Sequence, residues 1–229
     1  MRRLGLCFLL LFLAIAAAAG DPLSGWFDTS PSAGRYESVR QELVSIVAEA
    51  TGRGVPAELM ASRVAEGAEK RVAPEKLVTA LRKDLADYSA ILSVFARTMQ
   101  AAPEGRTRAE LLSRGGLALR AGMDIETFER AFAGALRKGA APRRAVDALV
   151  AVAAVDSRMP LDGESEAALA ASLASSAEKE DRFSQLASLL LRGKAGRLAT
   201  RDLVVLAVSV FDSGGGFLQL ESEISRRLK

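Results

Sequence analysis

Glu58 and Glu126 are acids at matched positions, 68 residues apart, each near the start of a predicted helix. Two carboxylates that face one another across a cleft carry out general acid–base catalysis and glycoside cleavage. A structural role competes with that chemistry, because the positive end of the helix dipole stabilises a negative charge in the first turn. We expect both glutamates to stabilise the N-terminal ends of their helices, and we predict no catalytic residue from the sequence.

Lys70 and Lys138 recur in the same way at the other end of these helices, with Arg71 and Arg137 beside them. Positive charge is favoured in the last turn of a helix. The functional alternative is a basic stripe that binds phosphate or lipid headgroups, but the near-neutral charge described below disfavours it. We therefore expect these residues to complement the helix dipole.

One glycine-rich segment and one acidic segment each have a functional and a structural interpretation. Gly214-Gly215-Gly216 precedes a predicted helix and could cradle an anion with backbone N–H groups. The Lys-Ser/Thr ending of a phosphate loop is missing, so we predict a flexible linker. Glu178-Lys179-Glu180-Asp181 lacks calcium-loop spacing, and we predict a solvated junction between helices.

Cysteine and histidine usage excludes several chemistries. The chain has one cysteine, Cys7, and no histidine. Outside residues 1–20 it therefore has no thiolate nucleophile and no Ser–His–Asp triad, and Ser45 and Ser113 recur without a visible base. His- or Cys-ligated metals are excluded on the same ground. We expect no cofactor, no metal centre and no enzymatic activity.

The first twenty residues have the layout of a secretory signal peptide. Arg2 and Arg3 precede an apolar run over residues 4–16, and small residues follow at 17–20. This predicts cleavage after residue 19 or 20 and export to the periplasm or the cell exterior, with membrane contact only in transit. An uncleaved helix that tethers the protein is the alternative, although the run is short for a membrane span. Lipidation at Cys7 is disfavoured because a large leucine precedes it.

Cleavage would remove most of the apparent basicity. The whole chain has 31 basic and 28 acidic residues. Arg2 and Arg3 lie in the predicted signal peptide, so 29 basic residues would remain against 28 acidic ones. A near-neutral chain exerts little long-range attraction on nucleic acid, and we expect no nucleic-acid partner.

Composition and periodicity predict an all-α fold. Ala, Leu and Val supply most of the 49% hydrophobic content, and Ala and Leu favour helices. Residues 21–34, rich in Pro and Gly, are predicted to be a flexible leader, in which Trp26-Phe27 is expected to dock onto the protein's own body. Residues 35–229 are predicted to form a single all-helical repeat domain that ends in a short helix at 216–228.

An internal repeat organises this domain. A shift of 68 residues aligns positions 40–81 with 108–149 without a gap, and fourteen residues are identical. A third, degenerate copy lies 126 residues from the first and keeps mainly the apolar spacing. We call residues 35–100, 101–162 and 163–212 the first, second and third copies. Each is predicted to be a three-helix unit, with helices at about 36–51, 56–70 and 74–99; 106–121, 124–138 and 142–157; and 163–178, 181–192 and 199–211.

Gly115-Gly116 falls inside a predicted helix of the second copy. Two glycines in a helix interior cost up to about 2 kcal/mol relative to alanine. Their presence predicts a kink or a close contact with another helix.

One segment of the first copy resembles a motif of uncharacterised exported bacterial all-helical proteins. The residues are Gly54-Val55-Pro56, then Glu66-Gly67, then Lys70-Arg71-Val72-Ala73-Pro74. The second copy matches only in part, because Asp124 replaces the first proline and Gly134-Ala135 replaces Glu-Gly. The resemblance implies a helical architecture and bacterial export, and it supplies no activity.

These observations favour a non-catalytic exported scaffold or protein-interaction protein of the bacterial envelope, whose partner is an unknown protein or envelope component. Stacked helical units present extended surfaces, so a partner should bind in a groove between copies and not in a deep polar pocket. The alternatives are a carboxylate-dependent cell-wall hydrolase and an envelope protein tethered by an uncleaved signal helix.

Overall fold

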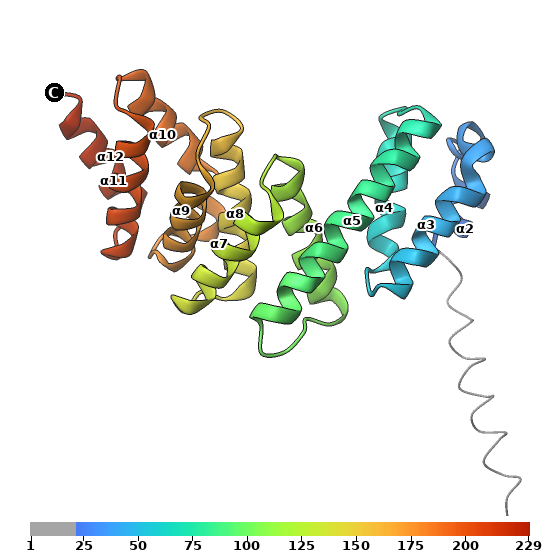
Figure 1. The fold of residues 1–229 in the computed structure, drawn as a ribbon. Coiled ribbons are helices and arrows are strands. Elements are labelled where there is room, and N and C mark those ends of the chain that lie inside the picture. The colour runs from blue at the N-terminus through green and yellow to red at the C-terminus, as the bar shows by residue number, and fades with distance from the viewer. Residues whose placement is uncertain (1–21) are drawn as a thin grey trace, which may run out of the picture. The chain divides into compact units, whose positions relative to one another are not determined.

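The computed structural model describes residues 22–229, and Figure 1 shows its helices in order along the chain. This part of the chain contains eleven α-helices and no strand, which confirms the all-α prediction. The predicted signal peptide and Cys7 lie outside the described residues. No helix within residues 22–229 is long and apolar enough to cross a membrane.

Contacts divide the chain into two compact units, with the boundary between Leu85 and Ala86. The sequence had instead predicted a single domain over 35–229. The helices of the N-terminal unit are α2 (Pro22–Thr29), η1 (Ala33–Val39), α3 (Arg40–Gly52), α4 (Ala57–Glu69) and the first part of α5 (Pro74–Thr98). The rest of α5 belongs to the C-terminal unit.

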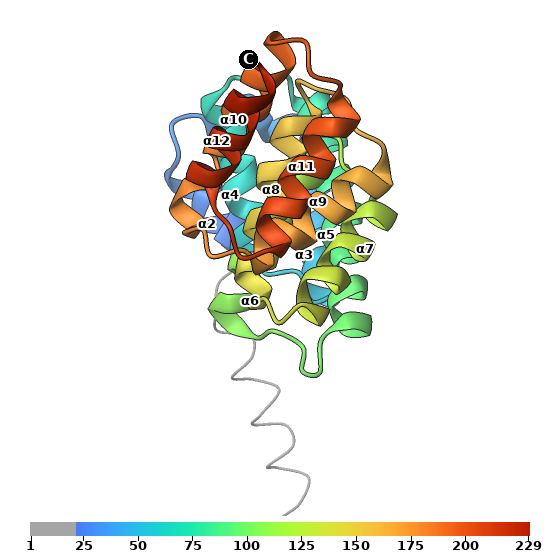
Figure 2. The ribbon, with the colours of Figure 1, turned by 90° about the vertical axis from the view of Figure 1, so that its left-hand side faces the viewer.

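The C-terminal unit continues with helices that follow the predicted ranges closely. They are α6 (Gly105–Arg120), α7 (Ile125–Arg137), α8 (Pro142–Asp156), α9 (Gly163–Ser175), η2 (Glu180–Arg182), α10 (Gln185–Ala195), α11 (Thr200–Asp212) and α12 (Phe217–Arg227). Within this unit α8 packs against α6, α9 and α10, and α7 packs against α9. Figure 2 shows this unit from the side of its last two helices, α11 and α12.

The segment predicted as a flexible leader is helical instead. In α2, Leu23 is fully buried and Phe27 is 8% exposed, and the helix packs against α4. The Trp26 ring lies 5.0 Å from Phe27 and 6.2 Å from Tyr36, which is the expected docking onto the protein's own body. Burial of these apolar side chains outweighs the local effect of Pro22 and Gly25, because Pro22 stands in the first turn, where a missing N–H costs nothing.

The second helix of each copy ends in the same way. The residue after the C-cap is left-handed in all three places: Arg71 (φ 55°), Gly139 (φ 84°) and Arg197 (φ 70°). The next N–H then bonds back five residues along the chain, at 2.9–3.1 Å, as in a Schellman motif. These bonds run from Val72 to Gly67, from Ala140 to Ala135 and from Leu198 to Gly193.

After this turn, the third helix of a copy packs closely against the second. A Cβ added at Gly67 would lie 2.5 Å from Leu77 Cδ1, and one added at Gly193 would lie 2.4 Å from Leu203 Cδ2. A Cβ at either position would therefore force the opposing leucine to shift. The corresponding second-copy positions are Ala135 and Ala145, both buried.

The glycine pair of α6 makes a close helix contact, as predicted. A Cβ on Gly115 would lie 3.1 Å from Ile91 Cδ1, and one on Gly116 would lie 2.6 Å from Tyr88 Cε1. The helix runs from Gly105 to Arg120 without interruption. The helix-propensity cost of the two glycines is thus compensated by packing of the aromatic and aliphatic side chains of α5.

Candidate functional site: a groove beside α8

The exposed face of α8 is apolar in its middle and charged at its ends. Arg143, Asp147, Val150 and Ala154 recur at four- and three-residue spacing and therefore share one side of the helix. Arg158 follows one turn later, just beyond the last helical residue. Val150 is partly exposed and Ala154 is exposed, so this apolar stripe is not covered by the fold.

A groove of about 930 Å³ lies along this face, between the second and third copies. Leu117 of α6 forms one wall and is 48% exposed, so it extends the apolar surface of Val150 and Ala154 into a patch. Phe183 and Ala187, from η2 to α10, form the opposite wall and are themselves buried. All of these residues belong to the C-terminal unit.

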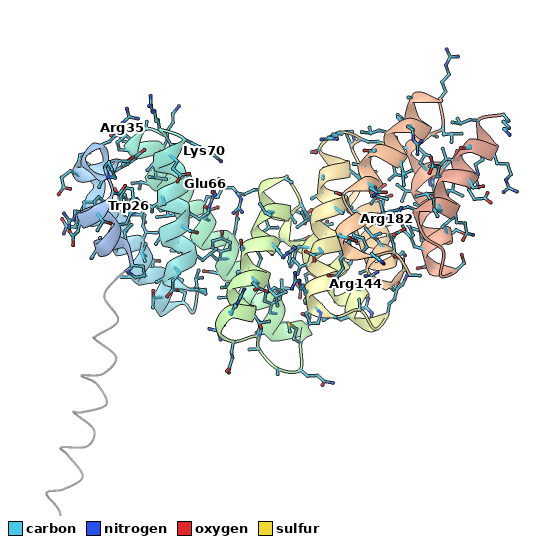
Figure 3. The ribbon with its side chains drawn as sticks, turned by 180° about the vertical axis from the view of Figure 1, so that it is seen from behind. Trp26, Arg35, Glu66, Lys70, Arg144 and Arg182 are labelled. Atoms are coloured by element: carbon cyan, nitrogen blue, oxygen red, sulfur yellow. The ribbon has the colours of Figure 1, made fainter. Side chains whose placement is uncertain are left out.

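Arg144 holds the wall opposite Leu117 in place. Its Nε donates to the carbonyl of Ala174 at 2.6 Å, and its Nη2 donates to the carbonyls of Ser176 and Glu178 at 2.8 and 2.7 Å. Its guanidinium also stands 4.9 Å from the ring centre of Phe183. The carbonyl of Ala174 lies in the last turn of α9, and those of Ser176 and Glu178 lie beyond it, where the helix supplies no backbone partner. One side chain therefore fixes the segment that borders the groove. Figure 3 labels Arg144 on this unit.

The prediction that residues 178–181 form a solvated junction is wrong for Glu178, because its side chain is buried. One carboxylate oxygen accepts the N–H of Phe217 at 2.7 Å, and the other accepts from Arg182 Nη1 at 3.0 Å. The N–H of Lys179 also donates to it, at 3.2 Å. Three donors offset the cost of burying this charge, and Glu178 thereby caps the first turn of α12.

The glycine run 214–216 was predicted to be a flexible linker, with an anion cradle as the alternative. Gly214 has φ 81° and closes α11, and Gly216 is the N-cap of α12. A Cβ on Gly216 would lie 2.9 Å from a carboxylate oxygen of Glu178. The one backbone N–H that binds a carboxylate here, that of Phe217, is therefore already occupied by the protein's own glutamate.

The rim of the groove is more positive than negative. It contains five basic residues and three acids: Arg114, Arg143, Arg144, Arg158 and Lys179, with Asp147, Glu180 and Asp181. Two of the acids have basic partners, because Arg114 pairs with Asp147 and Arg144 stands 3.9 Å from Glu180.

The remaining basic groups of the rim are less engaged. Arg143 reaches Glu110 only at 4.0 Å, and Arg158 and Lys179 form no ion pair within residues 22–229. The available charge around the apolar floor is therefore mostly positive.

The two glutamates first considered for catalysis occupy the predicted places. Glu58 is in the first turn of α4 and Glu126 in the first turn of α7. They belong to different compact units. Glu126 borders a second cleft of about 610 Å³ at the N-terminal ends of α7 and α9, where Asp124 and Asp162 act as N-caps.

The two N-cap aspartates are satisfied by their own helices. Thr127 N donates to Asp124 at 2.8 Å and Ser165 N donates to Asp162 at 2.7 Å, and these bonds lower the pKa of both carboxyls. Both groups stay ionised near neutral pH, so neither is suited to donate a proton.

Glu166 is the acid that sequence reasoning missed. Burial, together with the negative charges of Asp156, Asp124 and Asp162, raises its pKa to about 7. The side chain is 5% exposed and its Oε1 has no hydrogen-bond partner. Glu166 does not line either cleft. The local sequence shows it only as one of two glutamates in the first turn of α9, which gives no sign of burial.

The recurring lysines complement helix ends, as predicted. Lys70 is the C-cap of α4 and pairs with Glu66. Lys138 is the C-cap of α7 and bonds to Asp212 and, at 3.0 Å, to Ser172. Figure 3 labels Lys70 and Glu66 on the N-terminal unit. Each ammonium group has an acidic partner within the protein.

Within the described chain, no group of three or more acidic, histidine or cysteine side chains could hold a metal ion. No family model, curated protein or solved structure matches this chain.

Proposed function

We propose that the protein is a non-catalytic, exported helical-repeat scaffold that docks a protein partner in the groove beside α8. The observation that carries this proposal is Leu117, whose side chain is 48% exposed beside the apolar stripe of Val150 and Ala154. An uncovered apolar surface with a charged rim is the usual composition of a docking site. It lies between two copies, where stacked helical units present binding surfaces.

Site-specific photocrosslinking tests the docking proposal in the cell that makes the protein. A photoreactive residue replaces exposed Ala154 in the groove, and a matched variant places it at exposed Ala86, the first-copy counterpart 68 residues earlier. Discrete protein adducts from position 154 and none from position 86 support docking. Equal adducts from both positions, or none from position 154, would overturn it.

Export is part of the same proposal and has its own test. The composition of residues 1–20 supports it, because a basic start, an apolar run and small residues occur in the order of a signal peptide. Mass measurement of the purified envelope product should show the loss of about 20 N-terminal residues. An intact N-terminus on membrane-bound protein would favour the tethered alternative, and an intact N-terminus on protein in the cytoplasm would refute export.

A carboxylate-dependent cell-wall hydrolase remains the second candidate because Glu166 has the raised pKa that a general acid needs. Its burial and its absence from the lining of both clefts argue against contact with a polymer. The variant Glu166→Gln decides the matter in an assay of cell-wall clearance. We expect no activity in either form, whereas activity lost in a folded variant would favour the hydrolase.

A further inference from the structure

We infer that the partner segment is an amphipathic α-helix with acidic residues at both ends of its apolar face. This inference rests on the proposed docking function and specifies the chemistry of the partner. Three properties of the groove carry it: its length, its small floor residues and the placement of its positive charge.

The groove has the dimensions of a helix-binding trough. Arg143 and Arg158 are fifteen positions apart, which corresponds to about 22 Å at 1.5 Å per residue, or roughly four helical turns. Ala151, Ala154 and Ala187 line the groove and are small enough for another helix to approach closely. Leu117 projects from the side and provides one large contact for an apolar stripe at three- and four-residue spacing.

An extended peptide fits the same surface less well. Such peptides bind by adding a strand to a sheet edge, where main-chain groups supply the affinity. The described residues contain no strand, so no edge is available in this part of the chain. A helix satisfies its own backbone hydrogen bonds and needs only side-chain contacts from the groove.

The charges select an acidic helix. Arg143 lies at one end of the apolar stripe, Arg158 lies at the other, and Lys179 stands on the rim. Of the three rim acids, Asp147 and Glu180 already have arginine partners, so a basic partner would have to compete for them, and only Asp181 forms no ion pair within residues 22–229. Acidic groups at the partner's two ends would meet Arg143, whose ion pair with Glu110 is long at 4.0 Å, and Arg158, which forms none within residues 22–229; this favours encounter and fixes register.

The C-terminal helix provides an internal example of this mode of packing. In α12, the side chains of Phe217, Leu220 and Ile224 form a buried face, and α12 packs against α10 and α11. Glu221, on the same helix, pairs with Arg192 of α10 at 2.8 Å. An amphipathic helix with an acid beside its apolar face thus already covers one helical surface of this protein.

Two synthetic peptides test the inference with the mature chain. Both have four helical turns and the same apolar face, but one carries glutamates at each end and the other carries lysines. Fluorescence anisotropy should show the acidic peptide binding at least about ten-fold more tightly at low salt, with the difference shrinking as salt rises. Equal affinities, a preference for the basic peptide, or no binding of either peptide would overturn the inference.

Reversing the charge of two rim arginines tests whether the groove causes the preference for the acidic peptide. The double variant Arg143→Glu/Arg158→Glu should reverse the preference and bind the basic peptide more tightly. The matched control Arg53→Glu/Arg82→Glu changes the net charge equally at exposed first-copy arginines and should keep the preference for the acidic peptide. A preference that survives reversal in the groove, or that is lost in the control, contradicts the inference.

Two further measurements separate this inference from the proposed function. Vesicles containing an anionic phospholipid should not retain the mature chain, and retention that the groove reversal abolishes would identify a membrane surface in place of a helix. If position 154 crosslinks to a protein but the acidic peptide is not preferred, the docking function stands and only the partner's chemistry is wrong. If position 154 yields no adduct, the docking function itself fails.

Discussion

The first and second copies share the spacing of their buried apolar residues but differ in the polarity of exposed side chains at matched positions. Where the second copy exposes Leu117, the first has Glu49, which pairs with Arg53 at 2.5 Å. The pattern that packs a helical copy therefore leaves its outer face free to vary. The first copy has a polar, ion-paired surface at this position, whereas the second has an apolar wall.

The same difference recurs on the third helix of each copy. Val150, on the floor of the groove, corresponds to Arg82, which pairs with Glu42 at 2.8 Å. Exposed ion pairs of this kind contribute little to stability, but they keep a surface hydrated. The contrast supports the proposed docking function, since the first copy carries charged residues at both matched positions.

Arg144 and Lys76 are basic residues at matched positions of the second and first copies, but they make different contacts. Arg144 donates to three carbonyls and covers Phe183, whereas Lys76 is exposed at the start of α5. We expect Arg144→Ala to lower the free energy of unfolding by about 3 kcal/mol, because it leaves three carbonyls without their charged donor. Thermal denaturation should show a decrease in Tm of roughly 6–12 °C.

Lys76→Ala is the matched control, and it should change the free energy of unfolding by less than about 0.5 kcal/mol. The variant Arg144→Lys should recover only part of the loss, since an ammonium group cannot reproduce the planar fork of donors. Equal effects at the two positions would show that Arg144 does not hold the wall of the groove.

The third copy has a buried acid where the other two copies have an arginine. Glu166 stands where the first two copies have Arg40 and Arg108. Its pKa is about 7 in the folded protein, against 4.5 for an ordinary glutamate. The folded state therefore retains a proton that the unfolded state has lost, and stability falls as pH rises from about 4.5 to 7. The loss should reach up to about 3 kcal/mol and then level off.

Urea unfolding at pH 5 and at pH 8 measures this effect. The other carboxyls with shifted pKa values, such as Asp124 and Asp162, have lowered values, so their contribution changes below this pH range. Glu166→Gln should unfold with nearly the same free energy at both pH values. If that variant kept the full pH dependence of the parent chain, the buried acid would have to lie elsewhere.

The sequence predicted the helices well because their signals are local. The start of α5 at Pro74 and the stop at Gly54 follow from the backbone preferences of single residues, and apolar spacing located the buried faces. The site was less predictable. A groove between copies was expected, but the roles of Arg144, Glu178 and Glu166 depend on neighbours 30 to 39 residues away or on burial, neither of which leaves a local pattern.

The smallest expected effect concerns the packing after the shared helix stop, where the first copy has Gly67 opposite Leu77 and the second has two alanines. In Gly67→Ala, the new Cβ would lie 2.5 Å from Leu77 Cδ1, so the leucine must shift, at a cost of about 1–3 kcal/mol. Better helix propensity returns up to about 1 kcal/mol, which leaves a net loss near 1 kcal/mol. Gly52→Ala, which has open space around it, should instead be neutral or stabilising.

Adding Leu77→Ala to Gly67→Ala recreates the second-copy pair, and a double-mutant cycle should show that the two losses are less than additive. If the two losses of unfolding free energy were strictly additive, the cost of a Cβ at position 67 would not depend on the residue opposite it.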